Sequence, residues 1–420
     1  MMKRSLLLLP ALALALAACT PASPESAAES AVESAAESTA AAQDSATAET
    51  ATFPVGRLVE ADALWQTADA YYIADYDRPP KDGIIVPYVL KLDFATATEE
   101  KIWQAEQAVQ EFWQPIVQGG QIYLVLDSTL YRIPLEGGEA TSTPLPEGTL
   151  FSAADEYGLY SFAYERASNT VRGSRMDMET GQFTDLTLPP QTQDVHAVGE
   201  NRFLLTRLLT EAPLPNRDES EMYQAAVQNA IREYDWYDPA TGALEKIFEE
   251  PYYHGAEMED GTRHRRSFIG ANGQRLYFDW RMADGENGGI ESCRFDGTDW
   301  QPVPDIPENI TIFNWGHFDG DHLRWLFFTD DTTSPLQQTV YDLDTGTYYP
   351  HVPNNPINFI GSGYVVFETG HGDDAQGIYT IDGYWLPQLN WGFLSCLFGA
   401  NQKHPRPFGR GCCWFTLLSL

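Results

Sequence analysis

The sequence predicts an all-β fold built from one small four-stranded module that recurs along the chain. Short apolar or aromatic strands recur with their middle residues 37 to 73 positions apart. Each is followed by a second strand that ends in a turn rich in Asp and Gly. One such sheet cannot cover both of its own faces. Copies are therefore expected to stack around an axis as the blades of a β-propeller, at roughly 40–50 residues per blade.

The recurring strands are expected to be core strands first, because aromatic and β-branched residues pack well between neighbouring sheets. They are Tyr71–Ile73, Ile122–Leu124, Leu159–Ser161, Phe203–Leu205, Leu276–Phe278, Trp325–Phe327 and Tyr364–Val366.

The turns have a physical reason of their own. Asp accepts hydrogen bonds from the backbone N–H groups just ahead of it, and Gly takes the positive φ that reverses the chain. The turn segments are Lys91–Thr96, Pro134–Gly138, Met176–Gly181, Tyr237–Gly242, Phe295–Thr298, Tyr341–Gly346 and Ile381–Gly383.

The repeated turn, clearest in Tyr237–Gly242 and Tyr341–Gly346, resembles that of bacterial extracytoplasmic β-propellers of the quinoprotein-like and Tol-type classes. The resemblance covers roughly Phe53 to Asp382 and implies an architecture rather than an activity. The sequence departs from quinoprotein enzymes, since it has neither a Trp docking motif in each repeat nor a vicinal cysteine pair in this region. We therefore expect no cofactor.

Seven repeats predict a seven-bladed β-propeller, with six blades as the alternative if the first strand pair is a cap. The last repeat lacks a clear fourth strand after Asp382. We expect the segment Pro54–Val59 to supply that strand and to close the ring.

The start of the chain predicts a lipoprotein signal peptide over residues 1–18. Lys3 and Arg4 precede an apolar run that is too short to span a membrane, and Leu16-Ala17-Ala18-Cys19 matches a lipobox. The alternative is an ordinary signal peptide that contains a cysteine. The resemblance implies lipid attachment to Cys19, so the protein is expected at the cell envelope, anchored by lipid on the extracytoplasmic side.

Residues 19–52 predict a disordered spacer rich in Ala, Ser and Glu. An Ala-rich helix is the alternative, but Glu25, Glu29, Glu33 and Glu37 would repel one another along one helix face. The spacer would hold residues 53–384, the propeller, clear of the membrane surface.

Charge excludes some partners. The chain has 26 basic and 60 acidic residues, a net charge of −34. A nucleic-acid partner is not expected, because phosphate binding needs a basic surface. Cys293 is the one cysteine between Phe53 and Asp382, so no disulfide can form within that region.

The sequence between the fourth and fifth recurring core strands is longer than elsewhere and contains two further candidate segments. Asp218–Ile231 predicts a short amphipathic helix, either packed on the rim of the ring or acting as a contact for a partner. His264-Arg265-Arg266 forms a basic cluster, either a solvated hairpin tip or an anion contact.

The remaining candidates are acidic turns and a cysteine-containing tail. Asp342 with Asp344, and Asp373 with Asp374, are either turn formers or calcium ligands. His317 and His322 flank Asp319 and Asp321, and these residues are either part of a hairpin turn at Asp319-Gly320-Asp321 or a metal cluster. Residues 385–420 form an atypical tail that contains three of the five cysteines: Cys396, Cys412 and Cys413. The tail is either foreign to the ancestral fold or a genuine apolar appendage, and we expect low order in it.

No nucleophile elbow and no zinc-binding His-Glu-x-x-His pair occurs. The sequence therefore favours a non-enzymatic propeller that binds a protein, peptide or glycan, with no catalytic, cofactor or metal residues assigned. One alternative is a propeller-type polysaccharide hydrolase or lyase that uses paired carboxylates near the axis. A further alternative is an envelope assembly scaffold.

Overall fold

The computed structural model describes residues 53–380, except 77–84, 97, 166–167, 212–213, 216–219, 228, 253–264, 282–287, 304–311, 331–336, 353–356, 362–363 and 369–375. The described residues form antiparallel β-sheets, one short 3₁₀-helix and one α-helix. No helix among them is long and apolar enough to cross a membrane.

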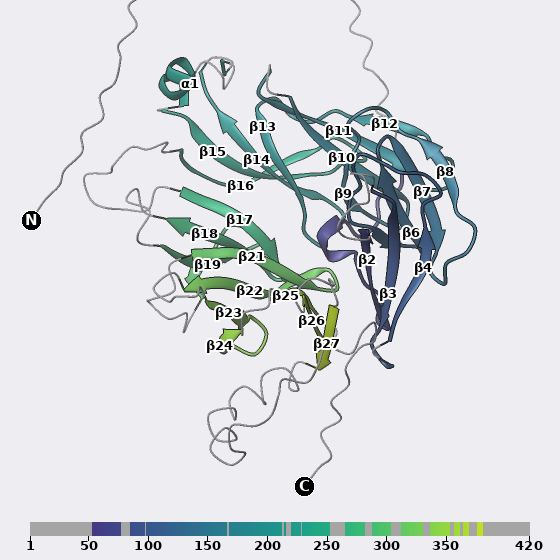
Figure 1. Ribbon diagram of the computed structural model, residues 1–420. Coiled ribbons are helices and arrows are strands. Elements are labelled where there is room, and N and C mark those ends of the chain that lie inside the picture. The colour runs from purple at the N-terminus through teal and green to yellow at the C-terminus, as the bar shows by residue number, and fades with distance from the viewer. Residues whose placement is uncertain are drawn as a thin grey trace, which may run out of the picture. The chain divides into compact units, whose positions relative to one another are not determined.

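Seven sheets follow one another along the chain, and each is a meander whose neighbouring strands pair in sequence order (Figure 1). The sheets are β2 (Ala70–Tyr76), β3 (Pro87–Asp93) and β4 (Thr98–Gln104); β5 (Ile116–Gln118), β6 (Gln121–Leu126), β7 (Thr129–Pro134) and β8 (Thr141–Pro144); β9 (Phe151–Ala154), β10 (Gly158–Glu165), β11 (Thr170–Asp177) and β12 (Phe183–Leu186), joined by β1 (Val59–Glu60); β13 (Thr192–Ala197), β14 (Phe203–Leu209), β15 (Ile231–Tyr237) and β16 (Leu244–Pro251); β17 (Arg265–Ala271), β18 (Arg275–Arg281), β19 (Gly288–Arg294) and β20 (Gln301–Pro302); β21 (Ile312–Asp319), β22 (His322–Asp330), β23 (Gln337–Asp342) and β24 (Thr347–Val352); and β25 (Ile357–Gly361), β26 (Tyr364–Glu368) and β27 (Gln376–Thr380).

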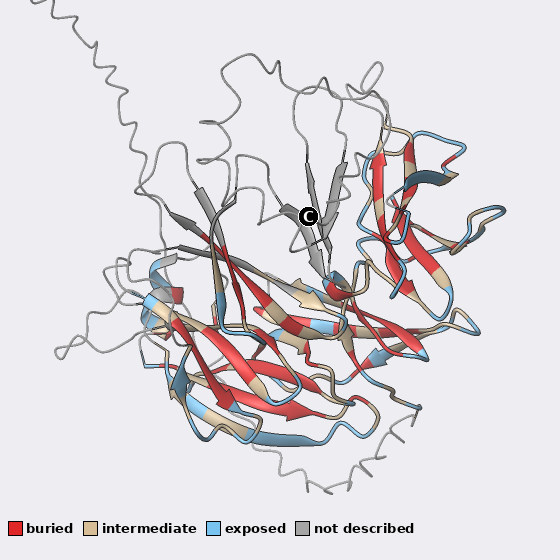
Figure 2. Cartoon of the chain, turned by 90° about the horizontal axis from the view of Figure 1, so that it is seen from below, coloured by how far each residue is buried: buried red, intermediate tan, exposed pale blue. Residues whose placement is uncertain are grey.

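Each predicted core strand lies where the repeat requires it, within β2, β6, β10, β14, β18, β22 or β26. Residues such as Leu124, Phe203 and Phe278 on these strands are fully buried. The last strand of a sheet, such as β4 or β16, is exposed and charged. Figure 2 shows this change from buried inner strands to exposed outer strands. Charge on an outer strand discourages edge-to-edge pairing with another chain.

The Asp turns take the predicted form. Asp177 accepts hydrogen bonds from the backbone N–H groups of Glu179 and Thr180, at 3.1 and 2.7 Å. Gly181 closes the turn with a φ of +71°. In the turns that begin at Asp238 and Asp342, the backbone N–H of the glycine, Gly242 or Gly346, donates to the carbonyl of the Asp. The predicted turn Ile381–Gly383 lies outside the described residues.

Successive sheets pack face to face, and this stacking makes the fold an all-β propeller. Five apolar clusters of the described residues each combine residues from two consecutive sheets. Leu130 of β7 packs with Leu159 of β10, and Trp236 of β15 packs with Leu276 of β18. Tyr277 of β18 packs in turn with Leu326 of β22. Apolar area buried in this way stabilises the fold by about 25 cal/mol per Å².

The predicted closure of the ring is wrong. Val59 and Glu60 form β1, which pairs with Ala154 and Ala153 of β9, not with the last sheet. The reason is local, because Leu58 is fully buried in the apolar cluster between the third and fourth sheets. The 3₁₀-helix η1 (Ala61–Ala63) follows and contacts β9 and β21. Figure 1 shows η1, in purple, between the two halves of the ring.

The two ends of the sheets differ. Turns from the first to the second strand, and from the third to the fourth, have two to six residues. We call the surface that they form the tight-turn face. The connections at the opposite ends reach 21 residues and include α1 (Ser220–Val227), and we call that surface the loop face.

The predicted insertion helix is confirmed as α1 over Ser220–Val227, but Ile231, which the prediction included, begins β15. Tyr223 and Val227 of α1 are buried against Leu208 of β14, whereas Met222 is exposed. The helix therefore packs on its own sheet at the rim. The alternative role of a partner contact stays a prediction.

Candidate functional site

The segment Gly56–Gln66, which we call the axial segment, runs inside the ring at the tight-turn face. Its first residues are held by turns of two sheets. The backbone N–H of Gly56 donates to Asp155 Oδ2 at 3.0 Å, and that of Leu58 donates to the carbonyl of Glu200 at 2.8 Å. Arg57 forms an ion pair with Asp321, in the turn of a third sheet.

The far end of the axial segment reaches one more sheet, the second, and contacts again the sheet that carries Asp321. The carbonyl of Leu64 accepts a hydrogen bond from the backbone N–H of Val117 at 2.6 Å. Gln66 Nε2 lies 3.5 Å from the carbonyl oxygen of Phe318. Hydrogen bonds or ion pairs therefore link one short stretch of chain to sheets on several sides of the ring.

Glu60 and His196 form a partly buried acid–base pair at the centre of this segment. Glu60 Oε1 accepts a hydrogen bond from the backbone N–H of Ala197 at 2.9 Å and lies 3.5 Å from His196 Nδ1. Loss of hydration raises the pKa of Glu60. Burial alone would lower the pKa of His196, but the hydrogen bond and charge of Glu60 outweigh it, so this pKa is also raised. The pair therefore holds a proton more tightly than free side chains do.

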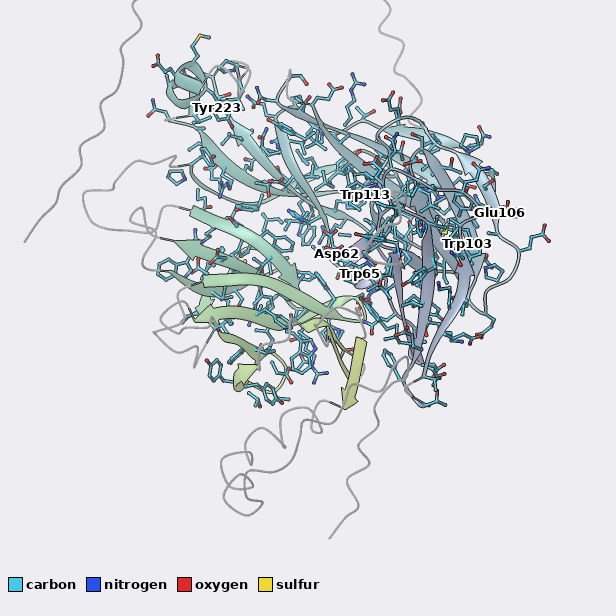
Figure 3. All side chains as sticks on the ribbon, viewed as in Figure 1. Asp62, Trp65, Trp103, Glu106, Trp113 and Tyr223 are labelled. Carbon is cyan, nitrogen blue, oxygen red and sulfur yellow. The ribbon has the colours of Figure 1, made fainter. Side chains whose placement is uncertain are left out.

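Asp62 places a second carboxyl two residues further on, in η1. Its side chain is exposed, yet loss of hydration raises its pKa. This combination describes a carboxyl that solvent reaches but that protein surrounds on several sides. Figure 3 marks Asp62 and the half-buried Trp65 near the centre of the ring. No sequence pattern marks Glu60 or His196, because their proximity depends on the unexpected position of β1.

The loop face carries the second candidate feature, the exposed Trp113. Its side chain is 44% exposed, an unusual state for so large an apolar group. The connection that carries it is nevertheless well anchored. Gln114 bonds to both the N–H and the carbonyl of Ala74, and Asp127 Oδ1 accepts from the N–H groups of Gln110 and Glu111. Trp113 is thus presented to solvent on a pre-organised segment (Figure 3).

The predicted basic cluster is not an anion contact at Arg266. This residue lies in β17, not at a hairpin tip, and its guanidinium pairs with Glu291 at 2.5 Å and with Glu250. It also lies 4.4 Å from the ring centre of Trp300. Its charge is therefore already neutralised within the protein. His264 lies outside the described residues, and the side chain of Arg265 is not described.

The acidic turn near Asp342 is occupied by an arginine. Arg324 contacts both oxygens of Asp342, each at 3.1 Å, and Asp319 at 2.7 Å. Asp344 lies 3.6 Å from Arg324 and 3.6 Å from His322. The guanidinium thus supplies the positive charge that a calcium ion would bring. Among the described residues, no three His, Cys, Asp or Glu side chains converge as metal ligands.

The cysteine predictions have different outcomes. Cys293 is a free, buried thiol, and burial raises its pKa to about 12. Cys19, the predicted lipid-attachment residue, lies outside the described residues, as do Asp373 with Asp374 and the tail from 385 to 420.

Comparison with known proteins gives neither a family nor a curated relative, since no family and no curated protein matches the chain. Solved structures do match. The β-propeller domain of the Trilobed protease from Pyrococcus furiosus is 12% identical, with a TM-score of 0.48, over 79% of this chain and 94% of that chain. TolB from Acinetobacter baumannii is 12% identical, with a TM-score of 0.37, over 75% and 78%.

An oligogalacturonate lyase in complex with manganese is also similar, at 12% identity and a TM-score of 0.43, over 78% of this chain and 93% of that chain. These are similarities of fold and carry no activity across. The predicted resemblance to Tol-type propellers holds at that level, and the stacked meanders described above define the fold independently.

Proposed function

We propose that this chain is a lipid-anchored, extracytoplasmic propeller that binds a protein, peptide or glycan through its loop face. The observation that carries the proposal is that the two faces differ, since the chain enters at one and an exposed tryptophan lies on the other. The chain that follows the predicted spacer enters at the tight-turn face, where Gly56 and Leu58 are fixed. The exposed, pre-organised Trp113 lies on the opposite face.

Trp113 supports binding because a rigid aromatic side chain supplies a large contact area at a small cost in entropy. Exposed tryptophans are over-represented among the residues that dominate binding energy. The hydrogen bonds of Gln114 and Asp127 fix the segment before any ligand arrives, which lowers the cost of association.

The anchor is tested by replacing Cys19 with Ser and labelling cells with an alkyne analogue of palmitate. We expect the label to disappear and the protein to move from the membrane to the soluble fraction. Thr20→Ala, a neighbouring change outside the predicted acceptor, should keep both properties. Equal labelling of the Cys19→Ser chain would refute the anchor.

Binding is tested by capture of partners from the native envelope with the full chain in mild detergent, together with a glycan array. Trp113→Ala should weaken capture by at least tenfold. Tyr157→Ala is the matched control, since Tyr157 is 47% exposed but lies in the β9–β10 turn on the tight-turn face. Equal loss with both variants would contradict a site on the loop face. Capture of a multi-protein membrane complex would favour the assembly scaffold.

A second function, polysaccharide hydrolase or lyase, is favoured by one observation. Glu60, beside His196, and Asp62, whose charge acts on Glu60, supply two carboxyls with raised pKa, a grouping suited to proton transfer. Its test is the release of new reducing or unsaturated ends from envelope polysaccharides. Glu60→Gln and Asp62→Asn should each abolish release, and activity that survives both changes would exclude this role.

We also infer that the seven described sheets are seven blades around one axis, in place of the six-bladed alternative. Each sheet from β5 to β24 has its own four-stranded meander, which supports counting each as one blade. An experimental density map with six sheets around the axis would overturn this count.

A further inference from the structure

A pocket on the tight-turn face lies apart from both features above. It has a volume of about 260 Å³ and lies beside the fourth sheet, between the β13–β14 turn and the β15–β16 turn. Asn201, Arg202, Trp236, Asp238, Ala243, Leu244 and Glu245 line it. Drug-sized ligands occupy pockets of roughly 300–1,000 Å³, so this one suits a smaller group, such as a single ring.

Two side chains of the pocket, Arg202 and Trp236, are held by contacts within the protein. The guanidinium of Arg202 lies 4.4 Å from the ring centre of Trp236 and donates to Glu245 Oε2 at 2.8 Å. Trp236 is itself fixed, because its Nε1–H donates to the carbonyl of Phe295 at 2.9 Å. A stacked arginine with one carboxylate partner still has further N–H groups to donate.

The amide of Asn201 adds a donor and an acceptor at the rim of the pocket. Its side chain is exposed and makes no hydrogen bond within the described part of the chain. Asp238, by contrast, is used by its own turn, where it accepts from the N–H of Ala240 and the hydroxyl of Thr241. The free hydrogen-bonding groups are therefore those of Asn201, Arg202 and Glu245.

Apolar surface alternates with these groups. Leu244 is 40% exposed, and Ala243 is small where the equivalent position of the third sheet, Gln182, is long. The two positions are equivalent because the carbonyl of each accepts a hydrogen bond from the backbone N–H of the Asp that begins its turn, Asp238 and Asp177 respectively. The small Ala243 leaves room in front of Leu244.

Charge narrows the ligand class. One guanidinium faces two carboxylates, those of Asp238 and Glu245, on a chain whose net charge is −34. An anion would be repelled by this surface. A neutral, hydroxyl-rich ring fits the pocket in charge and in hydrogen bonding. It is not repelled, and its hydroxyl groups can donate to Glu245 and accept from Arg202 and Asn201.

We propose that this pocket is a subsite for one neutral sugar ring of a glycan. It requires neither the lipid on Cys19 nor a partner at Trp113, so it stands or falls separately from the function proposed above.

Saturation-transfer NMR of the full chain in mild detergent, with glucose, galactose and N-acetylglucosamine as probes, tests the proposal. At least one neutral sugar should give a signal at millimolar concentration, and galacturonate, an anion, should give a weaker one. Ala243→Trp fills the pocket without removing a polar group and should lower the affinity at least tenfold.

Gln182→Trp places the same bulk at the equivalent turn of the third sheet and should leave the affinity unchanged. Thermal unfolding of both variants identifies any loss of folding. Silence of all neutral sugars, an equal response to galacturonate, or unchanged binding by a folded Ala243→Trp chain would each overturn the proposal.

Discussion

Two interfaces between neighbouring sheets use different chemistry. Between the second and third sheets, Leu130, Leu159 and Met176 are fully buried and the contact is apolar. Between the fourth and fifth sheets, an apolar cluster that includes Trp236 and Leu276 is supplemented by an ion pair from Arg266 of the fifth sheet to Glu250 of the fourth. Within the fifth sheet, Arg266 also pairs with Glu291. The same module therefore stacks through apolar area at both interfaces, and the second interface adds a partly buried ionic cluster. The ionic cluster also favours one orientation of the two sheets, because any arrangement that separates Arg266 from its partners leaves an uncompensated charge.

The largest effect is expected at the apolar interface. Leu159→Ala should lower the free energy of unfolding by about 2–5 kcal/mol, since it removes buried area and leaves a cavity. Chemical denaturation measures the change. Leu150→Ala, at a position that is 37% exposed, is the control and should change little. Equal effects from the two would break the comparison.

The ionic cluster around Arg266 should respond less. Glu291→Gln keeps the shape of the side chain but weakens the bond to Arg266, at a cost of about 1–3 kcal/mol in the free energy of unfolding. Because Glu291 is only 4% exposed, added salt should leave the cost nearly unchanged. A cost that vanishes in high salt would show that this cluster behaves as a surface pair.

The pair of Glu60 and His196 gives a pH dependence. Both pKa values are raised in the folded state, so the folded chain binds more protons than the unfolded chain. Stability is then greatest at low pH within the titration range and falls as pH rises above about 4.5 for Glu60 and above about 6.5 for His196.

Thermal unfolding from pH 5 to pH 8 should show this decline, and Glu60→Gln should make it shallower by removing the buried carboxylate. The same slope in the variant and the parent chain would mean that other groups set the pH dependence. The measurement thus separates the axial segment from the two sheet interfaces.

The smallest effect is expected at a surface ion pair. Arg172 lies 2.7 Å from Glu165, but its side chain is 76% exposed. Glu165→Gln should change the free energy of unfolding by about 0–1 kcal/mol, and that small cost should disappear in salt. A loss above this range would place Glu165 among the structurally important charges, with Glu291.

Much of the fold could be predicted from the sequence, because the repeat depends on contacts between residues that are close together in the chain. Asp177 and Gly181 form their turn through contacts within five residues, so the pattern is readable without neighbours. Strands such as Phe203–Leu205 are recognisable because burial on both faces leaves a continuous apolar run. The Tol-type resemblance added the same architecture.

The candidate site could not be predicted in the same way. Glu60 and His196 are 136 positions apart, and the apolar cluster that buries Leu58 is formed by residues of both the third and the fourth sheet. The expectation that Pro54–Val59 would close the ring rested on the missing fourth strand of the last repeat. That gap in the pattern does not reveal that Leu58 packs between other sheets. Arg266 illustrates the same limit, because its acidic partners lie in β16 and β19.

The axial segment has a mechanical consequence. A pull on the chain ahead of Phe53 is passed through Gly56, Arg57 and Leu58 to turns of three different sheets at once. Tension is then shared around the ring instead of peeling one outer strand. The exposed outer strands, such as β4 and β16, carry none of that load directly.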